Sequence, residues 1–438
     1  MNKAKKAGIL STLFMGLGQI VLNKEYIKGF VFMIIEVLIV IKYQFFIKGI
    51  KGLITLGTVT GYTQENIKLN DHSIFIMVDG FITLSILIVV VFVYVANIKD
   101  AIIQGRKLDQ GHPVETFRKF ISRFWYKAFP YIMSTPAIIG IMFFILLPIL
   151  FGIGIAFSNY SSPNNIPPAN LVDWVGLQNI KDMIRLPMWN KTFAGVFSWT
   201  LIWALSTTFI SFFTGLFVAL FINSKAVKYK KLWRIIYFLP YIVPAIISLL
   251  IFRNLLNGQF GPINLTLKKL GLIGSYFSLI KGNIGWLSNP LIARFSVLFV
   301  SLLLGFPYFM ALSTGVMTSI PEELYEASDI DGANGFQKFK SITLPMVFVA
   351  TAPLLIMSFA FNFNGFNAIY FLTEGGPSGI YDTGSAAGAT DILITWIYNL
   401  AVDRQNYSIA ALMTLLIFII VGLMAAYSFS RTRAFKEL

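Results

Sequence analysis

Long apolar runs separated by short polar segments dominate the pattern of this chain. A helix of about 20 residues crosses a hydrocarbon core of about 30 Å. On that measure the pattern predicts membrane-spanning helices near residues 29–48, 74–96, 132–157, 194–222, 235–252, 294–318, 346–372 and 408–429. The expected fold class is therefore an all-α polytopic membrane protein with about eight transmembrane helices.

The apolar run from Gly8 to Leu22 is shorter than the others and rich in glycine. If it were a ninth span, the basic stretch from Lys99 to Lys127 would move to the outer side of the membrane. Because basic loops stay in the cytoplasm, we predict that residues 8–22 are interfacial or re-entrant instead.

The distribution of basic residues gives the orientation. With the amino terminus inside, the predicted inner segments contain 22 of the 35 Lys and Arg residues and the predicted outer segments contain 12, with Lys42 inside a span. Among the predicted inner segments, the short loop from Lys225 to Arg234 has the highest concentration of basic residues. This bias predicts cytoplasmic amino and carboxyl termini. The net charge of +15 is explained by loops beside anionic lipid, so no nucleic-acid partner is expected.

Composition also limits the chemistry of the chain. It is 56% hydrophobic and only 13% charged, which is far too apolar for a soluble globule of 438 residues. There is no cysteine, and the two histidines, His72 and His112, are far apart, so no metal site is expected. A phosphate-binding loop needs a Gly-Lys step, which the sequence lacks. We expect no catalytic residues and no cofactor in this chain.

One polar interruption separates the sixth and seventh predicted spans, at residues 319–345. Pro321 suits a first helical turn, and the acidic pair Glu322 and Glu323 is favourable at a helix amino terminus. Gly332 can end that helix, and apolar residues then recur at helical spacing as far as Pro345. The pattern predicts two short helices at an angle, either as a docking surface or as an ordinary loop.

Two predicted spans carry neutral polar and aromatic residues at the i, i+3, i+4, i+7 spacing that places side chains on one helix face. The residues are Ser301, Leu304, Gly305 and Tyr308 in one span and Ser358, Phe361, Asn362 and Gly365 in the other. Amides and hydroxyls can bind sugar hydroxyls, and aromatic rings can pack on pyranose faces. From the residues alone, hydrogen bonding between helices and ordinary packing explain the same pattern.

The polar interruption resembles a known motif. Glu326-Ala327-Ser328, then Gly332, then Ile342-Thr343-Leu344-Pro345 are spaced as in the EAA loop of permease subunits of bacterial ATP-binding-cassette importers. The resemblance implies the type I importer permease fold. It also implies that Glu326, Ala327, Ser328 and Gly332 couple the chain to a separate ATPase subunit. Ser328 stands where the family usually has a second alanine.

Further runs resemble the maltose and maltodextrin permeases of that family: Leu304 to Tyr308, Ser358 to Phe366, Glu374 to Pro377 and Thr390 to Leu393. This resemblance covers most of residues 130–438. It implies that both polar faces bind substrate, with maltodextrin as the expected sugar. Ser301 and Gly365 stand where asparagines are usual, which leaves another oligosaccharide or a glycoside as the alternative.

The same resemblance implies an organisation and a set of partners. We expect residues 1–129 to hold the interfacial segment, two extra spans and a cytoplasmic linker, and residues 130–438 to form a six-helix core. The expected partners are a second, homologous permease subunit, two ATPase subunits that bind ATP and Mg, and an extracellular sugar-binding protein. Because segment 158–193 is too short for an extra outer domain, we expect the plasma membrane of a single-membrane, Gram-positive type bacterium.

Two other classes of function can be weighed on the same sequence. An ion-coupled secondary transporter needs intramembrane acids, and within the predicted spans only Glu36 and Asp79 are acidic. Both precede the predicted core. A membrane-embedded enzyme needs clustered carboxylates or histidines, and the nearest pair, Asp329 and Asp331, lies inside the loop motif. Both classes are therefore disfavoured.

Overall fold

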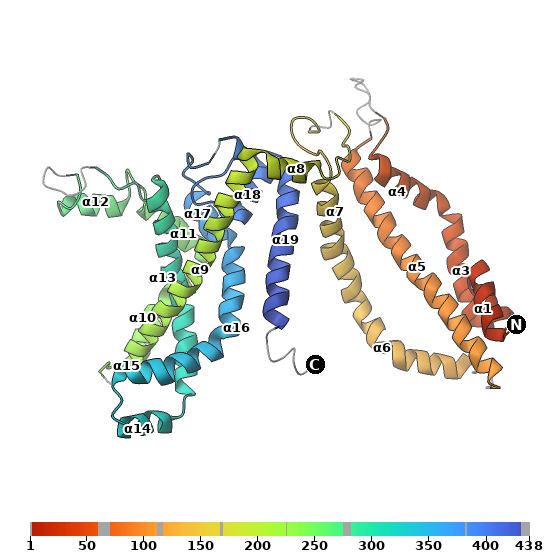
Figure 1. The fold of residues 1–438 in the computed structure, drawn as a ribbon, viewed down its shortest axis with the longest axis horizontal. Helices are drawn as coiled ribbons and strands as arrows, with labels where there is room; N and C mark the ends of the chain where they lie inside the picture. Colours follow the sequence, from red (N-terminus) through yellow and green to blue (C-terminus); the bar gives the residue numbers. More distant parts are fainter. Residues whose placement is uncertain are drawn as a thin grey trace. The chain divides into compact units, whose positions relative to one another are not determined.

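The computed structural model describes residues 2–59, 71–111, 117–166, 170–224, 226–274, 282–381 and 383–430. These residues are almost entirely helical, and within them the structure forms only one isolated antiparallel bridge, between Ser158 and Trp174. The chain divides into two compact units, Met1–Leu177 and Gln178–Leu438 (Figure 1). Lys225 and the carboxyl-terminal residues 431–438, which entered the charge argument, lie outside the described residues.

Within the described residues, five helical segments are long and apolar enough to cross a membrane, and two bent pairs raise the number to seven if each pair is one span. The five are Ser73–Asp109, Phe129–Ala156, Pro187–Asn223, Pro290–Thr318 and Gly335–Phe363. A shorter apolar helix covers Tyr407–Leu423, the described part of the last predicted span. The prediction of an all-α polytopic membrane protein is confirmed, with the count of eight as an approximation.

Both bent pairs were predicted as single straight spans. Helices α3 (Tyr26–Ile41) and α4 (Tyr43–Thr55) meet at 56°, and Lys42 between them has a non-helical backbone. Helices α10 (Lys230–Ile242) and α11 (Ala245–Leu255) meet at 86°. Pro244 causes the second break, because a proline disfavours the helical conformation of the residue before it, and that residue, Val243, is extended.

The seventh predicted span, 346–372, is also divided. Helix α16 (Leu344–Phe363) ends before Asn364, and helix α17 (Phe366–Thr373) begins after Gly365. The prediction of one continuous helix is wrong here. Asn and Gly both have low helix propensity, and at this point the backbone leaves the helical conformation, with a ψ of 75° at Gly365.

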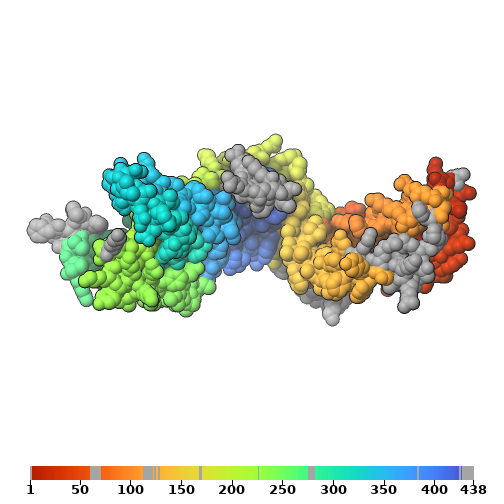
Figure 2. All heavy atoms as spheres, turned by 90° about the horizontal axis from the view of Figure 1, so that it is seen from below, coloured from red at the N-terminus to blue at the C-terminus, as the bar shows by residue number. Residues whose placement is uncertain are grey.

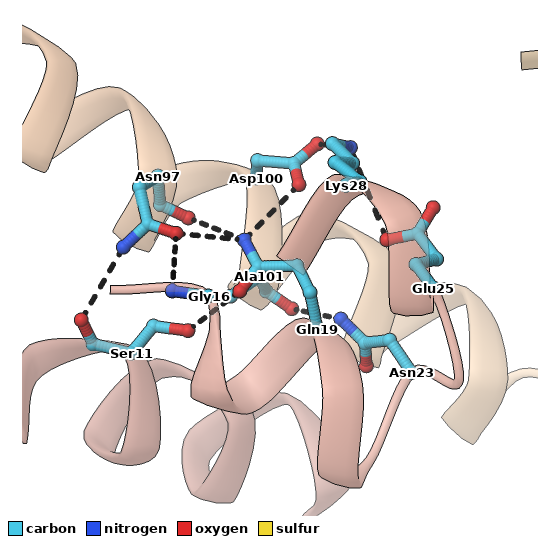
Figure 3. Close-up of polar contacts among 9 residues, drawn as sticks. All are labelled: Ser11, Gly16, Gln19, Asn23, Glu25, Lys28, Asn97, Asp100 and Ala101. Carbon is cyan, nitrogen blue, oxygen red and sulfur yellow. Dashed lines mark hydrogen bonds and ion pairs between the residues drawn. The ribbon is translucent and has the colours of Figure 1, made fainter. Parts of the chain in front are cut away.

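In unit 1, the segment 8–22 forms helices that pack on α5 (Ser73–Asp109). Helix α1 (Lys3–Leu13) and helix α2 (Leu17–Val21) are joined by a turn with Gly16 at φ +83°. Figure 3 shows the polar contacts that fasten this turn. The Gln19 amide nitrogen donates to Asn97 Oδ1 at 3.0 Å, and the Ser11 hydroxyl donates to Gln19 Oε1 at 2.9 Å. All three side chains are fully buried, so hydrogen bonds within unit 1 hold the turn against α5.

In unit 2, helices α9 (Pro187–Asn223) and α13 (Pro290–Thr318) lie side by side, and α16 packs against both (Figure 1). Close approach depends on a missing side chain, because a Cβ added to Gly215 would lie 2.6 Å from the backbone nitrogen of Met310. The Phe212 and Phe309 rings meet edge to face nearby, with centroids 5.8 Å apart. These helices form the rigid part of the unit on which both candidate faces are built.

Some of the remaining elements are parts of the apolar segments given above, and the others connect those segments. They are α6 (Phe117–Ile141), η2 (Met142–Leu146), α7 (Leu147–Ala156), α8 (Gln178–Arg185), α12 (Pro262–Lys269), α14 (Glu322–Ile330), α15 (Gly335–Lys338), η3 (Phe339–Thr343), η4 (Thr383–Ser385), α18 (Leu393–Tyr398), η5 (Asn399–Asp403) and α19 (Tyr407–Ser430). Three of them, η2, η3 and η5, are π-helical turns. The turns η2 and η3 continue directly into α7 and α16, whereas η5 is followed by non-helical residues before α19.

Candidate functional site

Loop 319–345 begins with a helix, as its sequence predicts. Pro321 immediately precedes α14, and Glu322 and Glu323 occupy its first turn, where the exposed N–H groups favour negative charge. The helix ends at Asp331, and Gly332 follows with a φ of +73°. That left-handed conformation costs glycine little, so the position of Gly332 at the turn is explained by its backbone.

The second half of the loop differs from its prediction. Helix α15 starts with a capping box between Asn334 and Gln337 and continues through the π-helical turn η3 into α16. Pro345 lies in the first turn of α16 instead of ending a short helix, so the predicted stop is wrong. Proline lacks an N–H, and the change in hydrogen-bonding register in η3 accommodates that loss.

Side-chain contacts tie α14 to the start of the following span. The Tyr325 and Thr343 hydroxyl oxygens are 2.8 Å apart, which joins α14 to η3. Lys338 forms an ion pair with Asp329 across the turn. The Ser328 hydroxyl donates to the Tyr325 carbonyl at 2.7 Å, so the serine that replaces the usual alanine is satisfied within its own helix. The loop is thus attached to α16 as one piece.

The outward surface of α14 is uncovered in unit 2. On α14, Ile330 is 88% exposed and Leu324 43%, and Glu326 and Ala327 are exposed as well. Phe336 on α15, after the turn, is 71% exposed. Figure 2 shows this part of the chain, in cyan, standing free on the face seen from below. The exposed surface of α14 therefore combines apolar and acidic side chains. The predicted coupling residues Glu326, Ala327, Ser328 and Gly332 lie together on this helix and the turn after it.

The residues predicted to share one face of α13 contact different neighbours in the fold. Tyr308 is 37% exposed and stacks on Tyr241 of α10, with ring centroids 6.3 Å apart. Gly305 instead faces α9, since a Cβ added there would lie 2.9 Å from the Ser211 hydroxyl oxygen. The Ser301 hydroxyl is buried, with no hydrogen-bond partner in the described part of the chain, and Leu304 is half-buried. Tyr308 is therefore the accessible member of this group, and Gly305 supports helix packing.

The predicted face of α16 also contains two kinds of residue. Phe361 is 77% exposed. Asn362 is half-buried, and its amide nitrogen donates to the Thr208 hydroxyl of α9 at 2.9 Å and to the Ser358 hydroxyl at 3.5 Å. Gly365 lies beyond the end of α16, so it is not on the helix face that begins at Ser358. The structure brings Ser358, Phe361 and Asn362 together at the end of one helix.

A cavity of about 400 Å³ lies in the segment between α17 and α19, and sequence reasoning assigned it no role. Asp391 lies at its base and is 1% exposed. Its carboxylate accepts from the Thr395 hydroxyl at 2.7 Å and the Gly388 N–H at 2.8 Å. Burial raises the pKa of Asp391 to about 7, against the lowering effect of these hydrogen bonds. The sequence signals at this place were a single acid in an apolar run and the two resembling runs, Glu374 to Pro377 and Thr390 to Leu393.

The described residues contain no group of three or more His, Cys, Asp and Glu side chains that could hold a metal ion.

The charged pair beside the cavity, Arg253 and Glu374, forms an ion pair at 2.8 Å. Both side chains are well exposed, at 41% and 59%, so the pair contributes little to stability.

Comparisons with known proteins place these features in a family. Residues 211–434 match the family described as "Binding-protein-dependent transport system inner membrane component". The galactooligosaccharides transport system permease protein GanP of Bacillus subtilis is 36% identical over 99% of this chain and 99% of its own length. The maltodextrin transport system permease protein MdxF of the same species is 38% identical over 99% of this chain and 97% of its own length. The similarity thus includes the amino-terminal unit as well as the predicted core.

A solved structure supports the fold. A bacterial ABC transporter involved in the import of the acidic polysaccharide alginate matches 72% of this chain and 99% of its own with a TM-score of 0.54. The sequence identity is 23%, so this match bears on the fold alone.

Proposed function

Because the chain belongs to the family of binding-protein-dependent transport system inner membrane components, we propose that it is the permease subunit of an ATP-driven importer for maltose and maltodextrins. It is a membrane subunit that does not itself catalyse a reaction. ATP and Mg would bind to two separate ATPase subunits. A second, homologous permease subunit would supply the other half of the pore.

The observation that carries this proposal is the attachment of the uncovered helix α14 to α16. The Tyr325 to Thr343 contact and the Lys338 to Asp329 ion pair join a docking surface to the span that carries Ser358, Phe361 and Asn362. A force applied to α14 would therefore reach the proposed sugar site without a flexible joint. Such an arrangement suits alternating access, in which ATP binding shifts the equilibrium between inward-open and outward-open states.

The substrate class is argued from the neutral character of the accessible groups. Tyr308 and Phe361 offer exposed aromatic rings, and Asn362 and Ser358 offer an amide and a hydroxyl. Rings and neutral polar groups match the C–H faces and hydroxyls of a pyranose chain. A galacto-oligosaccharide or another glycoside is the second candidate, because GanP and MdxF resemble the chain to nearly the same degree.

We also propose where the chain lies in the cell. The chain lies in the cell membrane of a bacterium, with loop 319–345 and both termini in the cytoplasm. The short segment between Phe157 and Gln178 would leave the outer face open to a lipid-anchored binding protein, as suits a host with a single membrane.

Uptake of labelled sugars tests the substrate. Cells that lack the chromosomal copy of this permease would be complemented with the intact importer, and uptake would be measured for maltose to maltoheptaose and for galactose oligomers of two to four units. The proposal expects ATP-dependent uptake of the maltose series. Uptake of the galactose series alone would overturn the maltodextrin assignment, and uptake that persists without the ATPase partner would overturn the importer class.

A further inference from the structure

Asn362 is held by helix α9 at two points. The Trp203 indole N–H donates to the Asn362 backbone carbonyl at 3.1 Å, and the Asn362 amide nitrogen donates to the Thr208 hydroxyl at 2.9 Å. Trp203 and Thr208 are each 1% exposed. One buried helix therefore fixes both the backbone and the side chain of a residue on another helix.

The backbone contact explains where α16 stops. The last carbonyls of a helix lack intrahelical partners, and Asn362 is the penultimate residue of α16. Its carbonyl accepts from both the Trp203 indole and the Gly365 N–H, the latter at 3.0 Å. The helix can therefore end at this depth without an unsatisfied carbonyl at Asn362.

The side-chain contact determines which end of the amide is free. The amide nitrogen is directed to the Thr208 and Ser358 hydroxyls. In the part of the chain that the structure describes, no protein donor reaches the amide oxygen, and that oxygen is not among the buried atoms without partners. An amide held this way presents its oxygen as an acceptor to the adjoining space.

We propose that Thr208 is a positioning residue for sugar transport, acting by holding the Asn362 amide so that its oxygen accepts from a substrate hydroxyl. This inference rests on the proposed function, because it assigns Asn362 to the sugar site. Thr208 itself does not touch the sugar. Helix α9 thus has a part in substrate selection, although the sequence motifs place the site on α13 and α16 only.

The packing of α9 suits this role. It lies along α13 with Gly215 against Met310, too close for any side chain at that position. On the amino-terminal side of Thr208, the Arg294 guanidinium of α13 lies 4.5 Å from the Trp199 ring centroid, a cation–π contact. A helix held on both sides of Thr208 keeps that hydroxyl in place, so the amide orientation costs no further ordering when sugar binds.

The chain offers a matched control one residue away. The Thr207 hydroxyl is buried, and among the described residues it has no hydrogen-bond partner. Thr207→Val and Thr208→Val therefore make the same chemical change at the same depth in α9, and only the second removes a contact to Asn362. Thr208→Ser keeps the hydroxyl and serves as the rescue variant.

The test uses the complete importer, with its partner subunits, in proteoliposomes and maltotriose as the probe. For each variant one measures the maximal uptake rate, the ratio of maltotriose to maltose uptake and ATP hydrolysis stimulated by the binding protein. Thr208→Val is expected to lower maltotriose uptake about two- to tenfold, as loss of one hydrogen bond would, and to change the sugar ratio. Thr207→Val and Thr208→Ser are expected to behave as the parent protein.

A double-mutant cycle tests separately whether Asn362 belongs to the sugar site and whether Thr208 acts through Asn362. If Thr208 acts through Asn362, adding Thr208→Val to Asn362→Ala changes uptake no further. Additive losses would overturn the positioning role while leaving Asn362 in the sugar site. Normal uptake and an unchanged sugar ratio in Asn362→Ala alone would remove Asn362 from the site, and both the site assignment and the inference would fall.

Discussion

The Tyr325 hydroxyl oxygen lies 2.8 Å from the Thr343 hydroxyl oxygen. Eighteen residues separate them in the chain, and the contact closes loop 319–345 between α14 and the π-helical turn before α16. Thr343 is 3% exposed, so the bond is protected from water on one side. The contact joins α14 to the turn that continues into α16.

Tyr325→Phe removes this bond without removing the ring. We expect ATP hydrolysis to continue while sugar uptake falls about two- to tenfold, because one lost hydrogen bond loosens the attachment of α14 to α16. The measurement is the number of ATP molecules hydrolysed for each sugar transported by the reconstituted importer. Tyr229→Phe, at an exposed tyrosine ahead of α10, serves as the control. An unchanged ratio in Tyr325→Phe would show that the contact has no part in coupling.

Glu326→Lys reverses the charge of the exposed face of α14. We expect the variant to insert normally but to lose transport and copurification of the ATPase subunit, because a docking surface matched to Glu326 would be repelled. Glu326→Gln, which removes the charge without reversing it, should retain part of the activity. Normal uptake by Glu326→Lys would argue against Glu326 as a coupling residue.

Phe361→Ala tests whether the exposed ring on α16 contacts sugar. Phe361 is 77% exposed within this chain, so its removal leaves no cavity in unit 2, and folding should be preserved. We expect maltotriose uptake to fall about two- to tenfold, in line with the value of one aromatic contact, and ATPase assembly to be unaffected. Phe92→Ala on α5, a ring that is 74% exposed, is the matched control. Equal effects of the two substitutions would indicate packing against lipid or a partner instead.

The buried carboxyl group of Asp391 makes the free energy of unfolding depend on pH. Its pKa is raised by burial from 3.8 to about 7, so between these values the folded state retains a proton that the unfolded state releases. The free energy of unfolding should therefore fall as the pH rises from about 4 to about 7, and change little from this group above that range. Thermal unfolding midpoints of the purified protein across this range measure the effect.

Asp391→Asn should flatten this dependence, because the group that titrates is gone. The midpoint at pH 5 is expected to be no higher than that of the parent protein, since an amide cannot accept from both Thr395 and Gly388 as the carboxyl oxygens do. Asp403→Asn, at the exposed rim of the same cavity, should keep the slope. A slope that survives Asp391→Asn would assign the pH dependence to another group.

Asn97→Leu tests the polar contacts of unit 1. Asn97 is fully buried, accepts from the Gln19 amide and donates to the Ser11 carbonyl. Removing it leaves buried groups unpaired, at a cost of about 1–3 kcal/mol each. We expect a lower unfolding temperature and faster proteolysis of residues 3–22. Gln259→Leu, at an exposed amide in unit 2, is the control, and equal stability of both variants would contradict the role of Asn97.

Several elements could be predicted from local sequence because their causes are local. Helix α14 begins after Pro321 and stops at Gly332, where proline and glycine act through their own backbone preferences. Helix α16 and its neighbours were found by their apolar length. The break at Pro244 had a local cause as well, although the apolar run around it predicted a single span.

Two of the failures arise from backbone conformations that the apolar pattern does not reveal, and one arises from a contact between distant parts of the chain. Pro345 resembles a helix stop, but the π-helical turn before it lets the helix continue. Gly305 and Tyr308 have the spacing of one helix face, yet contact with Ser211 of α9 turns one of them inward. Gly365 matches the i+7 position in the sequence but lies past the end of α16.

By itself the sequence determined that this chain is a helical membrane protein with a short helix and turn between two of its spans, because apolar length and turn residues act over a few neighbouring positions. Only the tertiary structure decided which side of each polar helix is accessible, because that depends on which helix packs beside it. Asn362 is the clearest case. Its place in the motif is a property of sequence, while the direction of its amide is set by Thr208, 154 residues away in the chain.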